Sequence, residues 1–306
     1  MADMTNVIMT EQDISKVSTK QKVTKIFVQI GLYLFLGIIA FIVLFPFYWM
    51  IISSFKTIKE YEAFTPTLYP HDFSVQGYNA VWEADNLVRA FGNTVLVGLV
   101  STILSLIITV LSAFAFARLE FKGKNVMFAL LLATMMIPGE LFTITNYQTV
   151  MKEFEWGNTY KVLIIPFLVS VFYIYLLKQN FMQIPNELYL AAKVDGTTDL
   201  KYLWKVMIPL ALPTLISITI LKMMGAWNTY MWPNLVLEGD EGKKLYLITL
   251  AIRKNDFTNS AEIAGSTANI PAQMAAVTLV STPLFMVFIF LRKYIMKGVS
   301  RSGIKG

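Results

Sequence analysis

The chain contains no cysteine and only one histidine, and Asp, Glu, Lys and Arg together make up 15% of its 306 residues. Without cysteine it has no disulfide, no thiolate metal site and no thiol nucleophile. The one histidine, His71, follows Pro70 in a polar segment and belongs to no cluster of metal ligands, so we expect a solvated loop residue. So few charges leave too little polar surface for a soluble domain of this size.

The sequence also lacks the glycine-rich loop G-x-x-x-x-G-K-[ST] with which nucleotide hydrolases hold phosphate. Its Gly-Lys pairs at positions 123 and 242 are followed by Asn125 and Lys244. We therefore expect no ATP hydrolysis by this chain. Neither paired carboxylates nor a nucleophile with its base share a predicted helix face. The prediction is a protein that is not an enzyme and has no catalytic residue, metal site or bound cofactor.

Apolar residues are abundant: they make up 56% of the chain, and the mean hydropathy is +0.56. A helix needs about 20 apolar residues to cross a bilayer, and six stretches meet this requirement. The fold class is therefore predicted to be all-α, integral to the membrane, with six transmembrane helices and no internal repeat. The predicted spans are residues 26–52, 91–117, 126–147, 161–177, 203–232 and 274–291.

Basic residues are divided unequally between the predicted loops. Six spans place both ends on one side, and that side carries 16 Lys and Arg against nine on the other. Because basic loops remain in the cytoplasm, both termini are predicted to be cytoplasmic. The expected organisation is a lead without regular structure over 1–25, a six-helix domain over 26–291 and a tail over 292–306. The basic balance is explained by this asymmetry and by anionic lipid, so no nucleic-acid partner is expected.

One long polar segment interrupts the cytoplasmic side: IPNELYLAAKVDGTTDLKYLWKVMIPLALP. Pro185 suits the first turn of a helix, and Glu187 complements the positive end of the helix dipole. Gly196 can adopt the left-handed conformation that ends a helix, and Thr198 or Asp199 can cap a second one. The segment, about residues 182–205, therefore predicts two helices joined by a bend.

The first of these helices carries a face with small side chains. Its residues at positions i, i+3, i+4 and i+7 are Leu188, Ala191, Ala192 and Asp195. The residues alone favour an amphipathic helix on the lipid headgroups. The alternative is a surface that a partner protein can approach closely.

The same segment resembles the EAA loop of membrane subunits from binding-protein-dependent, ATP-driven importers, I-P-x-E-L-x-E-A-A-x-x-D-G-A followed by a proline at the mouth of a span. The matching residues are Ile184, Pro185, Glu187, Leu188, Ala191, Ala192, Asp195, Gly196 and Pro209. Leu190 replaces the family's glutamate, and Thr197 replaces its alanine. In such importers this loop is a coupling helix seated in a cleft of a cytoplasmic ATPase, and the resemblance implies the same role here.

Two further stretches resemble carbohydrate-type permeases. WNTYMWPNL, from Trp227, is similar to W-N-x-F-x-W-P-L at the outer end of their fifth span. The C-terminal KGVSRSGIKG is similar to the tail of subunits related to the smaller permease of the maltose importer, which reaches between the two ATPases. The matching tail residues are Gly303, Lys305 and Gly306.

The resemblance implies a type I importer permease fold and a set of partners. These are a second permease subunit in a heterodimer, two ATPase subunits that bind ATP and Mg, and an extracytoplasmic solute-binding protein. The implied substrate is a sugar or oligosaccharide, moved by alternating access through the plasma (inner) membrane of a bacterium or archaeon. The competing prediction is a secondary transporter or channel that acts without ATP, which would show inverted repeats and intramembrane acids.

Two charged residues fall inside predicted spans, where charge is costly and indicates function. Glu140 and Lys222 lie at similar estimated distances from the cytoplasmic side, so they are predicted to pair and hold two spans together. The alternative is that Glu140 lines the transport path and binds sugar hydroxyls. Trp227 and Asn228 are further candidates for the path, although tryptophan at this depth is more often an interfacial belt residue.

Overall fold

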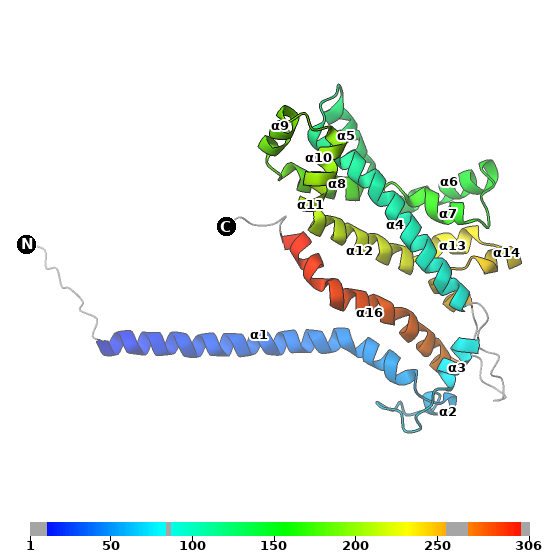
Figure 1. Ribbon diagram of the computed structural model, residues 1–306. Helices are drawn as coiled ribbons and strands as arrows, with labels where there is room; N and C mark the ends of the chain where they lie inside the picture. Colours follow the sequence, from blue (N-terminus) through cyan, green and yellow to red (C-terminus); the bar gives the residue numbers. More distant parts are fainter. Residues whose placement is uncertain (1–10, 84–86, 255–268, 301–306) are drawn as a thin grey trace, which may run out of the picture.

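The computed structural model describes residues 11–83, 87–254 and 269–300, and every regular element in these ranges is a helix (Figure 1). Three helices are continuous and long enough to cross a membrane: α1 (Glu11–Ser53), α4 (Leu87–Arg118) and α16 (Ile270–Ser300). They confirm the first, second and sixth predicted spans. Because α1 begins at Glu11, the lead that we expected to lack regular structure is helical from that residue onward.

The other three predicted spans are broken. Each consists of two helical parts joined at a sharp angle: 86° between Lys124–Thr134 and Gly139–Glu153, 45° between Tyr160–Phe167 and Val171–Met182, and 80° between Asp199–Leu210 and Leu212–Asn228. Their elements are α5 (Lys124–Thr134), η1 (Gly139–Phe142), α6 (Thr143–Gln148), η2 (Thr149–Glu153), α7 (Tyr160–Ile164), η3 (Ile165–Phe167), α8 (Val171–Met182), α10 (Asp199–Tyr202), η4 (Leu203–Met207), α11 (Ile208–Leu210) and α12 (Leu212–Asn228). If each bent pair counts as one span, the described chain has six.

Proline lies at or next to two of these breaks. Pro138 has ψ of 129°, outside the helical range, at the break before η1, and Pro166 lies just before the break that precedes α8. Proline cannot donate the backbone hydrogen bond that would continue a helix, and it restricts the residue before it. Pro283, in contrast, does not interrupt its span, since α16 continues through it. The predicted spans over 126–147, 161–177 and 203–232 are therefore bent pairs of helices.

Helix α4 runs between the two ends of the molecule and is the centre of the packing. It contacts α8, α12 and α15 (Ile248–Lys254) along its length (Figure 1). Its buried face carries mostly small side chains, including Gly98, Ser101, Thr102, Ser105 and Thr109. A Cβ on Gly98 would lie 3.1 Å from the Met223 sulfur of α12. Small residues permit this close approach of helices in a membrane, where packing replaces the hydrophobic effect.

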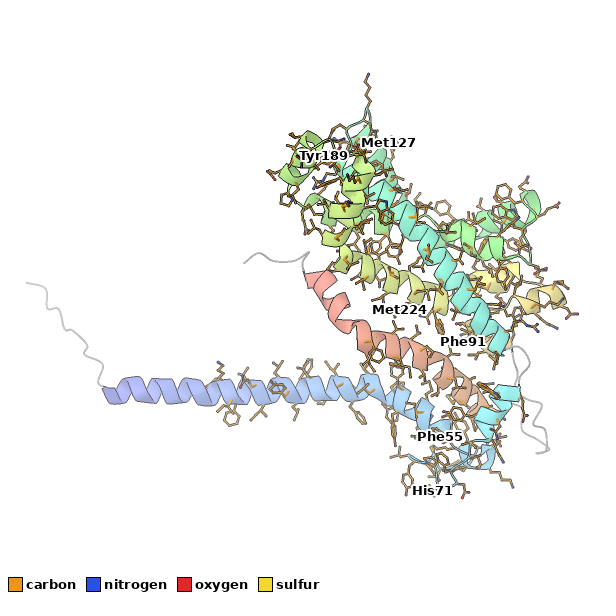
Figure 2. All side chains as sticks on the ribbon, in the orientation of Figure 1. Phe55, His71, Phe91, Met127, Tyr189 and Met224 are labelled. Atoms are coloured by element: carbon orange, nitrogen blue, oxygen red, sulfur yellow. The ribbon has the colours of Figure 1, made fainter. Side chains whose placement is uncertain are left out.

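Helix α1 extends away from the rest of the molecule (Figure 1). Its most apolar window has none of its residues buried, and its side chains project on all sides without a covering element (Figure 2). It packs against α16 only toward its C-terminal end, where the rings of Phe47 and Phe285 meet edge to face at 5.4 Å. An apolar helix exposed all round requires lipid or another protein around it.

Short helices form the end of the molecule farthest from α9 (Asn186–Val194): α2 (Ile58–Tyr61), α3 (Gln76–Glu83), α13 (Met231–Val236) and α14 (Gly239–Lys244). Asn93 of α4 stabilises this end by donating to the carbonyls of Lys244 and Tyr246 and accepting from the hydroxyl of Tyr160. His71 lies exposed in the loop before α3, as expected.

Candidate coupling helix and membrane cavity

The first helix predicted in the polar segment is present as α9, and its sequence determines both of its ends. Pro185 precedes the first helical residue, and Glu187 lies in the first turn. At the other end Gly196 has φ of +67°, its N–H donates to Lys193 and the N–H of Thr197 donates to Ala192. This pair of bonds is a Schellman motif, which favours glycine because a side chain is strained at positive φ. The predicted helix and its Gly196 bend are confirmed.

The second helix starts where the sequence indicated but does not lead straight into the membrane. The side chain of Thr198 caps α10, so the cap is Thr198 and not Asp199. The helical segment ends at Leu210, and α12 continues from Leu212 at an angle of 80°. Two bends, at Gly196 and at Ala211, therefore separate α9 from the membrane-spanning helix.

Helix α9 presents different residues to the protein and to solvent. Tyr189 and Ala192 pack against the core that contains Leu177, Phe181 and Tyr202. The outward face carries Glu187, Leu188, Ala191 and Asp195 together with Leu190 and Val194, which are 55% and 89% exposed. The four residues predicted to share a docking face are thus divided, because Ala192 points inward. The outward-facing residues of α9 form an exposed ridge, and most of them are apolar.

A cluster of three side chains, the Asp199 cluster, joins α9 to α10. The carboxylate of Asp199 accepts from the ammonium of Lys193 at 2.7 Å and from the hydroxyl of Tyr189 at 2.8 Å. These bonds hold the pKa of Asp199 below its ordinary value, and the same bond to Asp199 raises the pKa of Lys193. The ring of Tyr189 also lies 5.1 Å from the ring of Tyr202. The cluster fixes the angle at the Gly196 bend.

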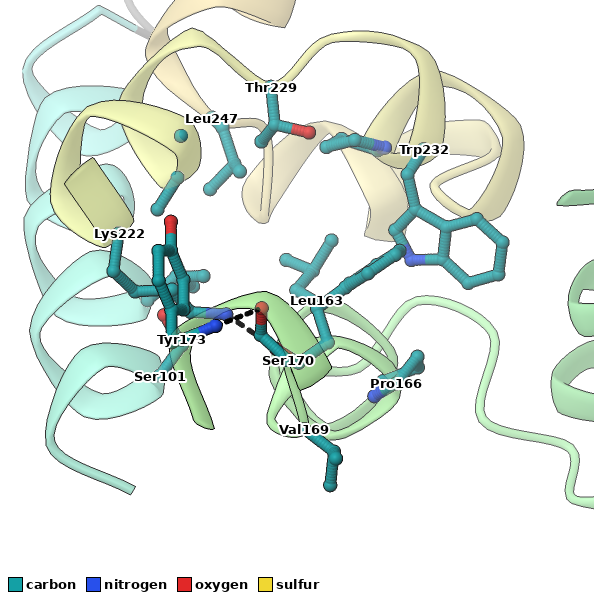
Figure 3. Close-up of a pocket in the computed structure, with 15 residues that line it drawn as sticks. Ser101, Leu163, Pro166, Val169, Ser170, Tyr173, Lys222, Thr229, Trp232 and Leu247 are labelled. Carbon is teal, nitrogen blue, oxygen red and sulfur yellow. Dashed lines mark hydrogen bonds between the residues drawn. The ribbon is translucent and has the colours of Figure 1, made fainter. Parts of the chain in front are cut away.

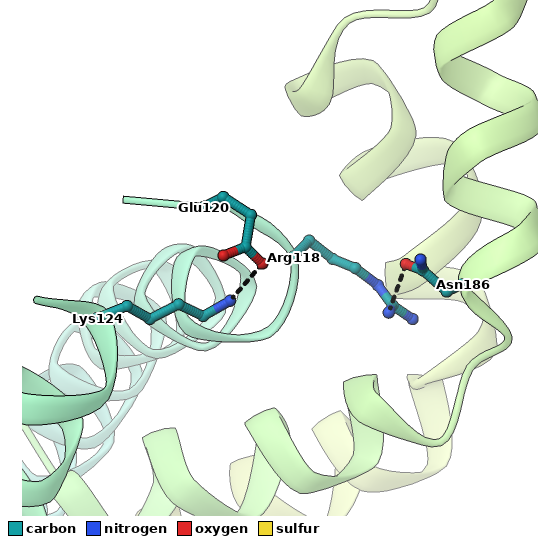
Figure 4. Close-up of polar contacts among 4 residues, drawn as sticks. All are labelled: Arg118, Glu120, Lys124 and Asn186. Atoms are coloured by element: carbon teal, nitrogen blue, oxygen red, sulfur yellow. Dashed lines mark hydrogen bonds and ion pairs between the residues drawn. The ribbon is translucent and has the colours of Figure 1, made fainter. Parts of the chain in front are cut away.

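Arg118 joins α9 to two membrane helices, a role that the sequence did not reveal. It is the last residue of α4, and its guanidinium donates to the carbonyls of Phe181 and Ile184 at 3.0 and 2.5 Å. It also donates to the side chain of Asn186, the first residue of α9, at 3.3 Å (Figure 4). A planar guanidinium suits three acceptors in different directions. Arg118 thereby holds together the ends of α4 and α8 and the start of α9.

A cavity of about 410 Å³ lies between α4, α8 and α12. Its polar lining includes Ser101, Ser170, Tyr173, Lys222 and Thr229, and Trp232 forms part of its wall (Figure 3). The indole N–H of Trp232 donates to the carbonyl of Val162, which fixes the ring in place.

The structure separates the residues predicted to form a path or an intramembrane pair. Lys222 lines the cavity and donates to the carbonyl of Phe167. Glu140 lies exposed in η1, and among the described residues no ion pair joins it to Lys222. Trp227 is buried and donates to the carbonyl of Val280 in α16, and Asn228 is exposed; neither lines the cavity. The physical reason is the bend at Pro138, which directs Glu140 away from a straight span.

Two predictions concern other parts of the site. The tail residues Gly303, Lys305 and Gly306 lie outside the described residues. Within the described ranges, no group of three or more His, Cys, Asp or Glu is placed to hold a metal ion.

Comparison with known proteins identifies the family. Residues 105–301, well over half of the chain, match the model of the binding-protein-dependent transport system inner membrane component. The arabinooligosaccharides transport system permease protein AraQ of Halalkalibacterium halodurans is 31% identical over 273 residues, covering 88% of this chain and 93% of its own. The polygalacturonan/rhamnogalacturonan transport system permease protein YtcP of Bacillus subtilis is 29% identical, covering 90% and 97%.

Solved structures agree. A chain from the crystal structure of a bacterial ABC transporter involved in the import of the acidic polysaccharide alginate matches with a TM-score of 0.77 and 26% identity, covering 88% of this chain and 96% of that one. The predicted permease fold is confirmed, as is the prediction that the chain is a membrane component and not the ATP-hydrolysing enzyme. This chain belongs to the family of inner membrane components of binding-protein-dependent transport systems.

Proposed function

We propose that this chain is a permease subunit of an ATP-driven importer for sugars or oligosaccharides, and that α9 is seated in a cleft of a cytoplasmic ATPase. The observation that carries the proposal is the exposed ridge of α9, with Leu190 and Val194 in solvent next to the small Ala191. Exposed apolar side chains flanking a small residue favour a protein contact. Leu190 replaces the carboxylate of the family motif, so we infer an apolar contact at that point.

The contacts around α9 explain how movement of an ATPase would reach the membrane. Arg118 joins α9 to α4 and α8, and the Asp199 cluster joins it to α10, from which the chain continues into α12. These same three membrane helices, α4, α8 and α12, line the cavity. Ser101 lies about 25 Å along α4 from Arg118 at 1.5 Å per residue. Displacement of α9 would therefore change the walls of the cavity and support alternating access.

The exposure of α1 supports the inference that a second membrane subunit packs against this chain. Its apolar side chains from Ile26 to Leu44 are covered by none of the described elements, and a related permease subunit and surrounding lipid would supply that cover. We infer a heterodimer of permeases with two ATPases, which bind ATP and Mg. The end with α9 and both termini would face the cytoplasm, as the basic loops predict. The short helices at the opposite end would then meet the solute-binding protein.

The cargo is inferred from the relatives. Those described above are named for arabinooligosaccharides, for polygalacturonan and rhamnogalacturonan, and for alginate, all of them carbohydrates. A cavity lined by hydroxyl groups and a tryptophan is chemically compatible with a sugar. A secondary transporter or channel remains the competing function, and it requires no partner at α9.

Copurification tests the proposal. We expect a cytoplasmic ATPase to purify with the wild-type chain and to be lost after Ala191→Trp, which places a large side chain on the exposed ridge. Ala63→Trp, at an exposed alanine near the opposite end, is the matched control and should keep the ATPase. If the ATPase stays bound to the Ala191→Trp variant, or never accompanies the wild type, the proposed docking of α9 is refuted.

A further inference from the structure

The cavity lies at the break between η3 and α8, where the second bent pair, which forms the fourth span, changes direction by 45°. Pro166, Phe167, Val169 and Ser170 belong to this break and line the cavity (Figure 3). Irregular backbone within a membrane protein is tolerated where it borders a cavity that can satisfy its polar groups. The break therefore brings backbone groups to the cavity wall, among them the carbonyl of Phe167, which accepts from Lys222.

Lys222 gives the cavity a positive charge. Among the described residues that line it, Lys222 is charged, and the others are neutral. Its ammonium donates one hydrogen bond to the carbonyl of Phe167, and an ammonium has three hydrogens to donate. Arginine or lysine within a membrane is costly unless a partner compensates it, and such residues mark substrate paths. The carbonyl of Phe167 carries no negative charge, so the positive charge of Lys222 is not balanced by it. An anion would therefore bind favourably at this site.

The start of α8 adds a second positive feature. Ser170 is the N-cap of this helix of 12 residues, and its hydroxyl accepts from the N–H of Tyr173 at 3.5 Å. The first N–H groups of a helix lack intrahelical acceptors, and the helix dipole places partial positive charge there. Ser170 and Tyr173 both line the cavity, together with Lys222 (Figure 3). In transporters, broken helices commonly direct such an end toward an anionic group of the substrate.

We propose that this cavity binds the carboxylate of an acidic sugar, a uronate unit, while the substrate crosses the membrane. Lys222 supplies the counter-charge, and the start of α8 supplies further donors. The hydroxyls of Tyr173 and Thr229 line the cavity and can bond sugar hydroxyls, whereas that of Ser101 donates to the carbonyl of Gly98 and can only accept. This inference rests on the proposed importer function and specifies its substrate class.

The charge balance favours a carboxylate over a phosphate. One lysine compensates one negative charge, whereas a phosphate group carries up to two and is usually bound by more cations or by arginine. A neutral sugar would leave Lys222 uncompensated in a medium of low dielectric constant. A carboxylate of the second permease subunit could also pair with Lys222, and the experiment below separates that case.

The test measures direct binding of defined probes by the assembled transporter in lipid nanodiscs, without the solute-binding protein. The probes are a trimer of galacturonate, its methyl ester and the neutral trimer of galactose, each measured by isothermal titration calorimetry. We expect the galacturonate trimer to bind about tenfold more tightly than either neutral probe. The methyl ester removes the charge from the ligand alone, so this comparison does not depend on the folding of any variant.

Variants then locate the charge. Lys222→Gln should abolish the preference for galacturonate, and Lys222→Arg should retain it. Lys161→Gln, at an exposed lysine of α7 outside the cavity, is the control and should bind like the wild type.

Three results overturn the inference: equal binding of the three probes, no binding of galacturonate, or a preference that survives Lys222→Gln. If Lys222 pairs with the second permease, the wild type shows no preference and Lys222→Gln loses that subunit, which also refutes the inference. None of these results affects the requirement for ATP or the docking of α9, which Ala191→Trp tests separately.

Discussion

The guanidinium of Arg118 lies 2.5 Å from the carbonyl oxygen of Ile184, two residues before α9 begins. One residue at the end of α4 therefore fixes the start of the helix that we propose docks on an ATPase. A single side chain that connects three helix ends is a point where docking can be transmitted or lost.

Replacing Arg118 by methionine should weaken this connection. Each hydrogen bond to a charged group contributes about 1.5–3 kcal/mol, and this buried side chain makes three. The desolvation of the guanidinium offsets part of their sum, so we expect a loss of about 2–5 kcal/mol in stability. We also expect ATP hydrolysis to continue while substrate uptake falls, because α9 no longer moves with α4 and α8. Thermal unfolding and uptake per ATP measure the two effects. Lys122→Met, at a neighbouring exposed basic residue, is the control, and equal effects from both changes would contradict this role.

Replacing Gly196 by alanine should destabilise the end of α9. A side chain at φ of +67° costs about 1–2 kcal/mol. Gly92→Ala makes the same chemical change inside α4, where nothing lies within 4 Å of the new Cβ, and should be neutral or stabilising. The melting temperature should therefore fall in the Gly196→Ala variant and stay the same or rise in the Gly92→Ala variant. A Gly196→Ala protein as stable as the wild type would show that the bend does not constrain α9.

The Asp199 cluster should depend on pH in a defined way. The pKa of Asp199 is depressed from its ordinary value of 3.8, so its contribution to stability is complete above pH 3.8 and is lost as the pH falls through the lower folded-state pKa. The pKa of Lys193 is raised from 10.5, so its contribution is complete below pH 10.5 and is lost as the pH rises through the higher folded-state pKa.

Asp199→Asn removes this dependence. The difference in melting temperature between the wild type and Asp199→Asn should be constant between these limits and should shrink outside them. A difference that changes around neutral pH would mean that another group governs the bend.

Trp227 and Trp232 should behave differently when each is changed to phenylalanine. Trp227 donates to the carbonyl of Val280 and lies outside the cavity, so its loss should reduce stability by about 1 kcal/mol and leave substrate preference unchanged. Trp232 donates to Val162 and lines the cavity, so its loss should reduce stability and also alter substrate preference. Uptake of competing sugars measures preference. If Trp227→Phe changes preference, that residue belongs to the path.

The sequence predicted those features that local patterns determine. The spans of α1, α4 and α16 follow from continuous apolar runs, and α9 follows from Pro185, Glu187 and Gly196, whose effects act within one turn of helix. It did not predict which prolines would bend a span or how sharp the bends would be. A proline indicates where a helix can break, yet the chain leaves the helical conformation at Pro138 and α16 continues through Pro283.

The contacts within the candidate site were harder to predict from the sequence. The sequence did not distinguish Arg118 from the other basic residues of the predicted cytoplasmic loops. Its acceptors are carbonyls more than 60 positions away, which no local pattern indicates. Its place at the end of the small-residue face of α4 was the one signal that it would be buried. Lys222 was expected to meet Glu140, but it meets the carbonyl of Phe167, which becomes available only because the neighbouring span breaks. Ala191 and Ala192 looked equivalent until the core of Tyr202 showed which one points inward.

The most direct test of coupling through α9 is substrate uptake by the assembled transporter in proteoliposomes, with ATP supplied on the side that carries α9. We expect the wild type and Ala63→Trp to take up an oligosaccharide only while ATP is hydrolysed, and Ala191→Trp to take up none. Uptake at the same rate without ATP, or undiminished uptake by Ala191→Trp, would contradict coupling through α9.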